Sequence, residues 1–201
     1  MGVFICLFVG LLLSLLVSGG TKGKSPISVR QIVMAAISFR GASIALVGRF
    51  VREHGISWVE AFGLRNASAR SVALGALVIC GFLPVGSLLQ SGSLEVLQHF
   101  GIETAAQSAV EALRSASRGP GLLAFALITV VVAPLGEELL FRGVLYPAIK
   151  RAGYPRLALW GTSILFAAIH FNLPIFLPLL LLALLLVWLY EQTDNLLAPL
   201  A

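Results

Sequence analysis

The sequence predicts an all-α fold, a polytopic membrane helical bundle with about six transmembrane or membrane-associated helices. Three observations lead to this class. Hydrophobic residues make up 58% of the 201-residue chain and charged residues only 11%, whereas soluble domains contain about 25% charged residues. Several uncharged stretches approach or exceed the 18–20 residues that cross a bilayer as a helix. None of them shows the period-2 alternation expected of a barrel strand.

The apolar stretches place the expected helices in chain order. Five of them lie at Val3–Val17, Gln31–Val51, Val72–Gln90, Leu157–His170 and Leu173–Tyr190. Another opens after "RGPG" and ends before the basic turn Lys150–Arg156. The segment Ser93–Ser117 mixes apolar residues with regularly spaced glutamates, which favours an amphipathic helical region on the membrane surface. The uncharged N-terminus lacks a basic region before it, so a retained anchor helix is favoured over a signal peptide.

The charge pattern fits a membrane protein better than a nucleic-acid-binding one. Net charge is +5 and the pI is about 9.8, and basic residues are expected in short cytoplasmic loops. Lys150, Arg151 and Arg156 accordingly predict that this turn is cytoplasmic. Cys6 and Cys80 lie in separate apolar segments without metal-ligand spacing, and each is expected to be a small buried or lipid-facing residue.

Two carboxylates and a guanidinium stand out within the apolar segment "VVAPLGEELLFRGVLYPAIKR". An ionised residue at the centre of a membrane helix costs about 2.5–3.5 kcal/mol on insertion scales. Glu138 and Arg142 have i,i+4 spacing and can pair, while Glu137 points roughly 140° away from Arg142 on a helix. Carboxylates in different environments can take different roles, one ionised and one a base. The alternative is an ion-pair cluster that only holds helices together.

His170 is the second ionisable group in this half of the chain. It lies one helix after the glutamates, and the short turn between the helices predicts antiparallel neighbours. Because Glu137 and His170 lie at similar distances from that turn, their depths should nearly match. A glutamate and a histidine that share one water form a minimal hydrolytic arrangement, in which the histidine orients the water or binds a metal. The alternative is a histidine that caps or packs the end of its helix.

These motifs resemble those of the CPBP intramembrane proteases, which include the type II CAAX prenyl endopeptidases and the bacteriocin-processing or Abi proteins. "EELLFR" at Glu137–Arg142 matches Glu-Glu-x-x-x-Arg, and "FAAIH" at Phe166–His170 matches Phe-x-x-x-His. Gly143 follows the arginine, "LYEQTDNLLAP" comes later, and "FGLR" at Phe62–Arg65 resembles a looser upstream element.

The resemblance implies an integral membrane endopeptidase, expected in a bacterial inner membrane among lipid, that cleaves a membrane-associated peptide or protein. It assigns water activation to Glu137 and His170, and supporting roles to Glu138, Arg142 and Phe166. Zinc held by Glu137 and His170 and a metal-free glutamate mechanism both remain open. The implied organisation is an N-terminal helical part with its amphipathic connection at residues 1–118, and a catalytic core at residues 119–201.

The chain departs from the family pattern in two places. Leu180, Ala183 and Val187 stand where Phe-x-x-Gly-x-x-x-Gly is usual, which puts close helix approach at Val187 in question. A final His/Asn motif would follow Ala201, and losing one oxyanion donor typically costs about 10²–10³ in rate. The alternative expectation is therefore a catalytically impaired membrane protein of the same fold, acting as an immunity or partner-binding factor.

Overall fold

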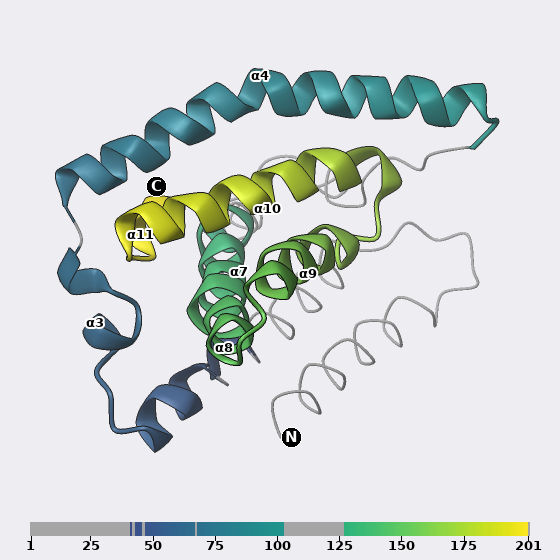
Figure 1. The fold of residues 1–201 in the computed structure, drawn as a ribbon. Coiled ribbons are helices and arrows are strands. Elements are labelled where there is room, and N and C mark those ends of the chain that lie inside the picture. Colours follow the sequence, from purple (N-terminus) through teal and green to yellow (C-terminus); the bar gives the residue numbers. More distant parts are fainter. Residues whose placement is uncertain (1–40, 42, 46, 67, 103–126, 201) are drawn as a thin grey trace. The chain divides into compact units, whose positions relative to one another are not determined.

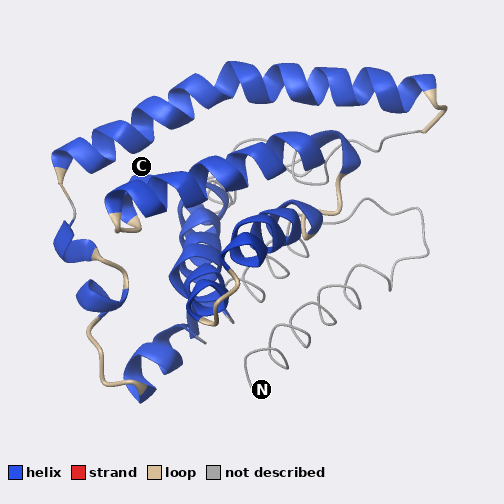
Figure 2. Ribbon diagram, viewed as in Figure 1, coloured by secondary structure: helices blue, strands red, loops and turns tan. Residues whose placement is uncertain are grey.

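The computed structural model describes residues 41–102, apart from 42, 46 and 67, and residues 127–200. Every regular element in these ranges is a helix, and no strand occurs among them (Figure 2). The all-α class is confirmed, while the count of about six helices stays a prediction. The expected helix Val3–Val17, most of Gln31–Val51 and residues 103–117 lie outside the described residues.

The chain forms two compact units. One contains residues 55–105 and 138–201, and it includes most of the described helices. The other contains residues 1–54 and 106–137. The boundary falls inside a single helix, between Glu137 and Glu138.

The longest described helix is α4, Ala69–His99. Ser68 caps its N-terminus by accepting from the Ser71 backbone N–H, and the Ser71 hydroxyl accepts in return from the Ser68 backbone N–H. This reciprocal cap satisfies two N–H groups that the first turn would otherwise leave without a partner. The helix was expected to end at Gln90, but it continues to His99, since residues 91–99 contain no residue that must break it.

Gly101 ends this helix. Its φ is +69°, a region that glycine enters without steric cost. The Ile102 N–H bonds to the Leu97 carbonyl and the Gly101 N–H to the Gln98 carbonyl, which is the Schellman arrangement.

The segment that carries the glutamates is helical throughout, and two of its turns are widened. A π-helical turn η2, Ile128–Val132, leads into α7, Ala133–Leu140, and a second, η3, Phe141–Leu145, leads into α8, Tyr146–Arg151. Glu137 and Glu138 therefore lie in a helix rather than a loop, as predicted. Pro134 and Pro147 each follow a π turn by two residues. A proline ring clashes with the carbonyl four residues earlier, and for both prolines that carbonyl lies in the π turn.

A three-residue turn joins α8 to α9, Pro155–Ala168. Gly153, with φ +92°, ends α8, and Pro155 opens α9 at a position where its missing N–H costs nothing. The unit's part of the glutamate-bearing helix, from Glu138 onward, packs beside α9. Helices α8 and α9 are thus neighbours joined by a short turn, while the antiparallel arrangement expected around Glu137 and His170 stays a prediction.

The last two helices are α10, Leu173–Thr193, and α11, Leu197–Leu200. Helix α10 packs against α4 and against α9 (Figure 1). Asp194 ends it in the left-handed conformation, at φ 47° and ψ 35°. Helices α4 and α10 are both long and apolar enough to cross a membrane, by length and composition. The short helices α3, Trp58–Ala61, and η1, Leu64–Asn66, precede α4.

Candidate active site

Glu138 and Arg142 form a buried ion pair within the larger unit. Arg142 Nη1 lies 2.7 Å from Glu138 Oε1, and the two residues are only 1% and 3% exposed. The pairing predicted from the i,i+4 spacing is confirmed. The effective cost of removing each ion from water is several kcal/mol, and close geometry with additional hydrogen bonds is needed to offset it.

Arg142 also connects two other helices. Its Nη2 donates to the Ala183 backbone carbonyl in α10 at 3.1 Å. Its guanidinium carbon lies 4.7 Å from the centre of the Phe166 ring in α9, a distance at which a cation is attracted by the face of an aromatic ring. Phe166 is 4% exposed and meets Phe141 edge to face, with ring centres 5.2 Å apart. The Arg142 side chain therefore links its own turn to α9 and to the middle of α10.

His170 also contacts Phe166. The two ring centres are 5.2 Å apart, and His170 Nδ1 lies 2.8 Å from the Phe166 carbonyl oxygen. Because a carbonyl can only accept, this hydrogen bond requires the proton on Nδ1 and leaves Nε2 as the acceptor or metal-binding nitrogen. The expected capping contact is present, and it is also the contact that orients a histidine whose other nitrogen does chemistry.

The chain turns sharply just after His170. Phe171 has φ 47°, a left-handed conformation that is uncommon for a bulky residue. Asn172 then stands at the N-cap of α10, but its side chain makes no capping hydrogen bond. Helix α10 therefore begins without a side-chain cap.

Glu138, Arg142, Phe166 and His170 thus form one continuous series of contacts. Glu137 precedes this series in α7, is half-buried, and belongs to the other compact unit. The distance between its carboxylate and the His170 imidazole stays a prediction.

The segment that contains Ala183 and Val187, where the family usually has glycines, still packs closely against its neighbouring helices. Ala183 is fully buried, and its carbonyl is the one that receives Arg142. Val187 is 2% exposed and packs with Tyr146 and Ala158 in a small apolar cluster. The valine therefore fills the interface between α10 and its neighbours, and the approach at Ala183 is close despite it.

Comparison with known families supplies the decisive observation. Residues 119–201 match the model of the Type II CAAX prenyl endopeptidase Rce1-like family. This part of the chain is similar to the CAAX proteases. No curated protein and no solved structure matches the chain. The family is a membrane-embedded protease family, so the protein is assigned to the membrane peptidases, with a peptide or protein as its substrate.

The described residues do not provide the ligands of an ordinary catalytic zinc centre. Catalytic zinc sites normally use three protein ligands. Within residues 41–102 and 127–200, where described, no three His, Cys, Asp or Glu side chains converge. Glu137 and His170 would supply two, so the described residues do not form a three-ligand site, and no step below depends on a metal.

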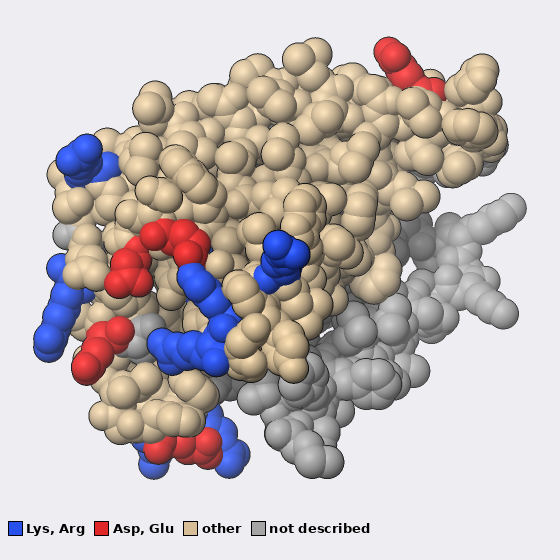
Figure 3. All heavy atoms as spheres, in the orientation of Figure 1, with Lys and Arg blue, Asp and Glu red and all other residues tan. Residues whose placement is uncertain are grey.

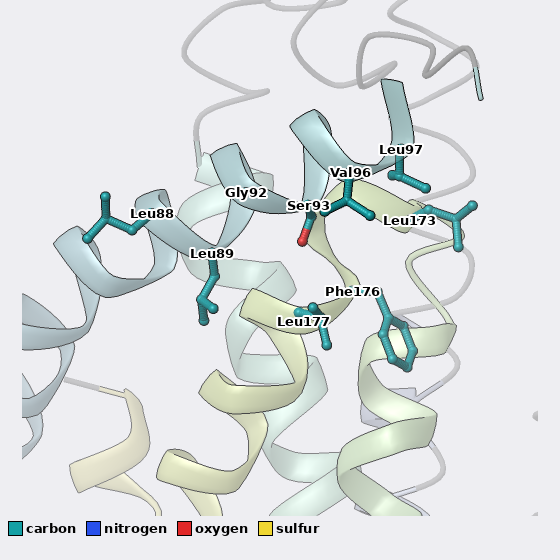
Figure 4. A pocket seen from close by; sticks show the side chains of 9 residues that line it. All are labelled: Leu88, Leu89, Gly92, Ser93, Val96, Leu97, Leu173, Phe176 and Leu177. Carbon is teal, nitrogen blue, oxygen red and sulfur yellow. The ribbon is translucent and has the colours of Figure 1, made fainter. Parts of the chain in front are cut away.

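An apolar hollow of about 420 Å³ lies between α4 and α10 (Figure 4). Its walls come from the last third of α4 and the first turns of α10: Leu88, Leu89, Gly92, Ser93, Val96, Leu97, Leu173, Phe176 and Leu177. The Ser93 hydroxyl is the polar group of this wall, and it has no hydrogen-bond partner among the described residues. The hollow begins three residues after His170.

The sequence alone did not reveal which residues pack against the turn that carries Arg142. Phe62 and Gly63 of "FGLR" contact Gly143, Asp194 and Leu196. "FGLR" and "LYEQTDNLLAP" lie far apart in the sequence, and neither motif indicates that the two segments meet.

Proposed function

We propose that the protein is an intramembrane endopeptidase that hydrolyses a peptide bond of a membrane-associated substrate with a water activated by Glu137 and His170. One observation supports it most. The series Glu138–Arg142–Phe166–His170 joins both family motifs through contacts of 2.7 Å, 4.7 Å and 5.2 Å within one compact unit.

The proposed roles of Glu137, Glu138 and His170 follow from the partners that these side chains have. Glu138 forms a buried ion pair with Arg142 and so balances the charge of the guanidinium. Glu137 is then the candidate base, because it leaves the helix about 100° away from Glu138. His170 Nε2 is the candidate acceptor that orients the water, since Nδ1 is engaged by the Phe166 carbonyl.

The chemical step uses one water and no other reactant. Glu137 accepts a proton from the water as its oxygen attacks the scissile carbonyl carbon, and a tetrahedral intermediate forms. The carbon–nitrogen bond then breaks, and the proton on Glu137 passes to the departing amine. The carboxylate is regenerated, so the base of the first step is the acid of the second.

The test is to search for cleavage without assuming a substrate. The protein and its variants are expressed in cells lacking it, and new N-termini in membrane proteins are identified by mass spectrometry. A prenylated CAAX peptide and its unprenylated counterpart are added to purified protein in vesicles. Glu137→Gln and His170→Ala should each remove cleavage by two orders of magnitude or more, on the order of the effect of losing a catalytic base.

Matched controls come from the far end of α4. Glu95→Gln and His99→Ala make the same chemical changes at exposed positions, and both should leave cleavage unchanged. If wild type yields no new N-termini, or if Glu137→Gln cleaves fully, the proposal is wrong. Metal analysis of the purified protein, with and without a chelator, decides separately whether cleavage requires zinc.

A further inference from the structure

The short segment Phe62–Asn66 packs behind the Arg142-bearing turn, and the proposed chemistry gives it no role. It contains "FGLRN" and lies about 80 residues before that turn in the sequence, but in the same compact unit. Its neighbours are Gly143 of η3 and the turn Asp194–Leu196 between α10 and α11.

The contact between Phe62 and Gly143 leaves no room for a side chain. A Cβ added to Gly143 would lie 2.6 Å from Phe62 Cε1 and 3.0 Å from Cδ1. Phe62 is itself only 4% exposed. Its ring therefore rests directly on the backbone next to Arg142, within the π turn Phe141–Leu145.

The segment is anchored on its other side, so Phe62 cannot simply withdraw. A Cβ on Gly63, whose φ is +63°, would lie 2.0 Å from the Asp194 carbonyl oxygen. The Leu196 N–H donates to the Phe62 carbonyl at 3.2 Å. Asn195, which is fully buried, donates from Nδ2 to the Asn66 carbonyl at 3.4 Å.

We propose that Phe62–Asn66 is a positioning segment of the active site, with Phe62 and Gly143 as its contact pair. It fixes the π turn Phe141–Leu145 relative to the end of α10. Arg142 then stays within reach of both Glu138 and the Ala183 carbonyl. Neither Phe62 nor Gly143 touches the substrate. The activity readout of this inference rests on the proposed function, but its structural readout does not.

The experiment inserts one methyl group and then makes room for it. Gly143→Ala should lower kcat by about 10–100-fold with KM within about twofold, because small misplacements of catalytic groups have effects of this size. Phe62→Leu in the same protein should regain most of that loss. The matched control is Gly81→Ala in α4, where an added Cβ meets nothing within 4 Å, and it should leave kcat unchanged.

A second measurement reports on Arg142 directly. The side-chain Nε signal of Arg142, assigned by its disappearance in Arg142→Met, is followed by ¹⁵N NMR in micelles. Gly143→Ala should shift it, Gly81→Ala should not, and Phe62→Leu should move the Gly143→Ala signal back towards wild type. This signal is informative even if wild type proves inactive, an outcome that would refute the proposed function alone. An unmoved Arg142 signal in Gly143→Ala, or an activity loss that only follows the loss of folded protein, overturns the inference.

Discussion

The Arg142 guanidinium makes an ion pair, a hydrogen bond to a backbone carbonyl and a contact with an aromatic face, all while 1% exposed. These contacts explain how a charge is tolerated in so apolar a chain. Each partner offsets the other's loss of hydration, and removing one leaves a buried charge uncompensated.

Arg142→Met should therefore lower the free energy of unfolding by about 3–5 kcal/mol. The double variant Glu138→Leu with Arg142→Met should regain much of this loss, since neither charge remains. Denaturant unfolding in micelles measures both. The control is Arg49→Met, whose partner Glu53 is also at i+4 but whose pair is exposed, and it should cost less than about 1 kcal/mol. Equal costs for Arg142→Met and Arg49→Met would show that burial does not govern the pair.

The sequence was sufficient to predict the contact that Arg142 makes within its own helix. The i,i+4 rule predicted the pair of Glu138 and Arg142 because both residues lie on one helix. The hydrogen bond to Ala183 joins residues 41 positions apart, and no periodicity encodes such a contact. For the same reason the sequence could not predict the contact between Phe62 and Gly143, although each residue belongs to a recognisable motif.

At the scale of elements, the π turns are the feature that apolar patterning could not reveal. One extra residue in a turn barely alters a hydrophobic segment, so Ile128–Val132 and Phe141–Leu145 were expected only as helix. The Tyr146 N–H bonds to the Phe141 carbonyl, five residues back. The proline that follows each turn supplies a reason for the widening, because its ring requires room at the carbonyl four residues earlier.

Pro147→Ala should let the turn close to α-helical geometry, since alanine has the N–H that proline lacks. The unfolding free energy should stay the same or rise, while Arg142 rotates away from its partners. Peptidase activity should then fall by about 10–100-fold. The control is Pro155→Ala at the start of α9, where proline displaces no hydrogen bond. Comparing kcat and denaturant midpoints of the two variants is the measurement. Full activity in Pro147→Ala would mean that the π turn is incidental to the site.

At the scale of the larger compact unit, charge collects at one end of the helices. Helices α4 and α10 run antiparallel, because the end of α4 and the start of α10 line the same hollow. At the opposite end, Asn66 Nδ2 donates to Asp194 Oδ2 at 3.4 Å and Lys150 pairs with Glu191. In the face that Figure 3 shows, most of the blue and red side chains gather toward this end, and the broad surface beyond them carries almost no charge. The composition predicted such a bare apolar band, but not which helix ends share a side.

This arrangement predicts the membrane orientation of both long helices. Arg70 at the start of α4 should lie on the same side as Arg151 at the end of α8, and the positive-inside rule makes that side cytoplasmic. Glu95, near the other end of α4, should lie across the membrane, because residues 70–95 span about 38 Å at 1.5 Å per residue. The bilayer core is about 30 Å thick, so the helix is long enough.

Single cysteines test this orientation after Cys6 and Cys80 are replaced by serine. Arg70→Cys and Arg151→Cys should react with a membrane-impermeant maleimide in inside-out vesicles, and Glu95→Cys only in right-side-out vesicles. All three positions are exposed, so an absence of labelling reflects the membrane and not the fold. Detergent-solubilised protein, in which every site should react, is the control for thiol reactivity. Labelling of positions 70 and 95 from one side would show that α4 lies along the membrane surface and does not cross it.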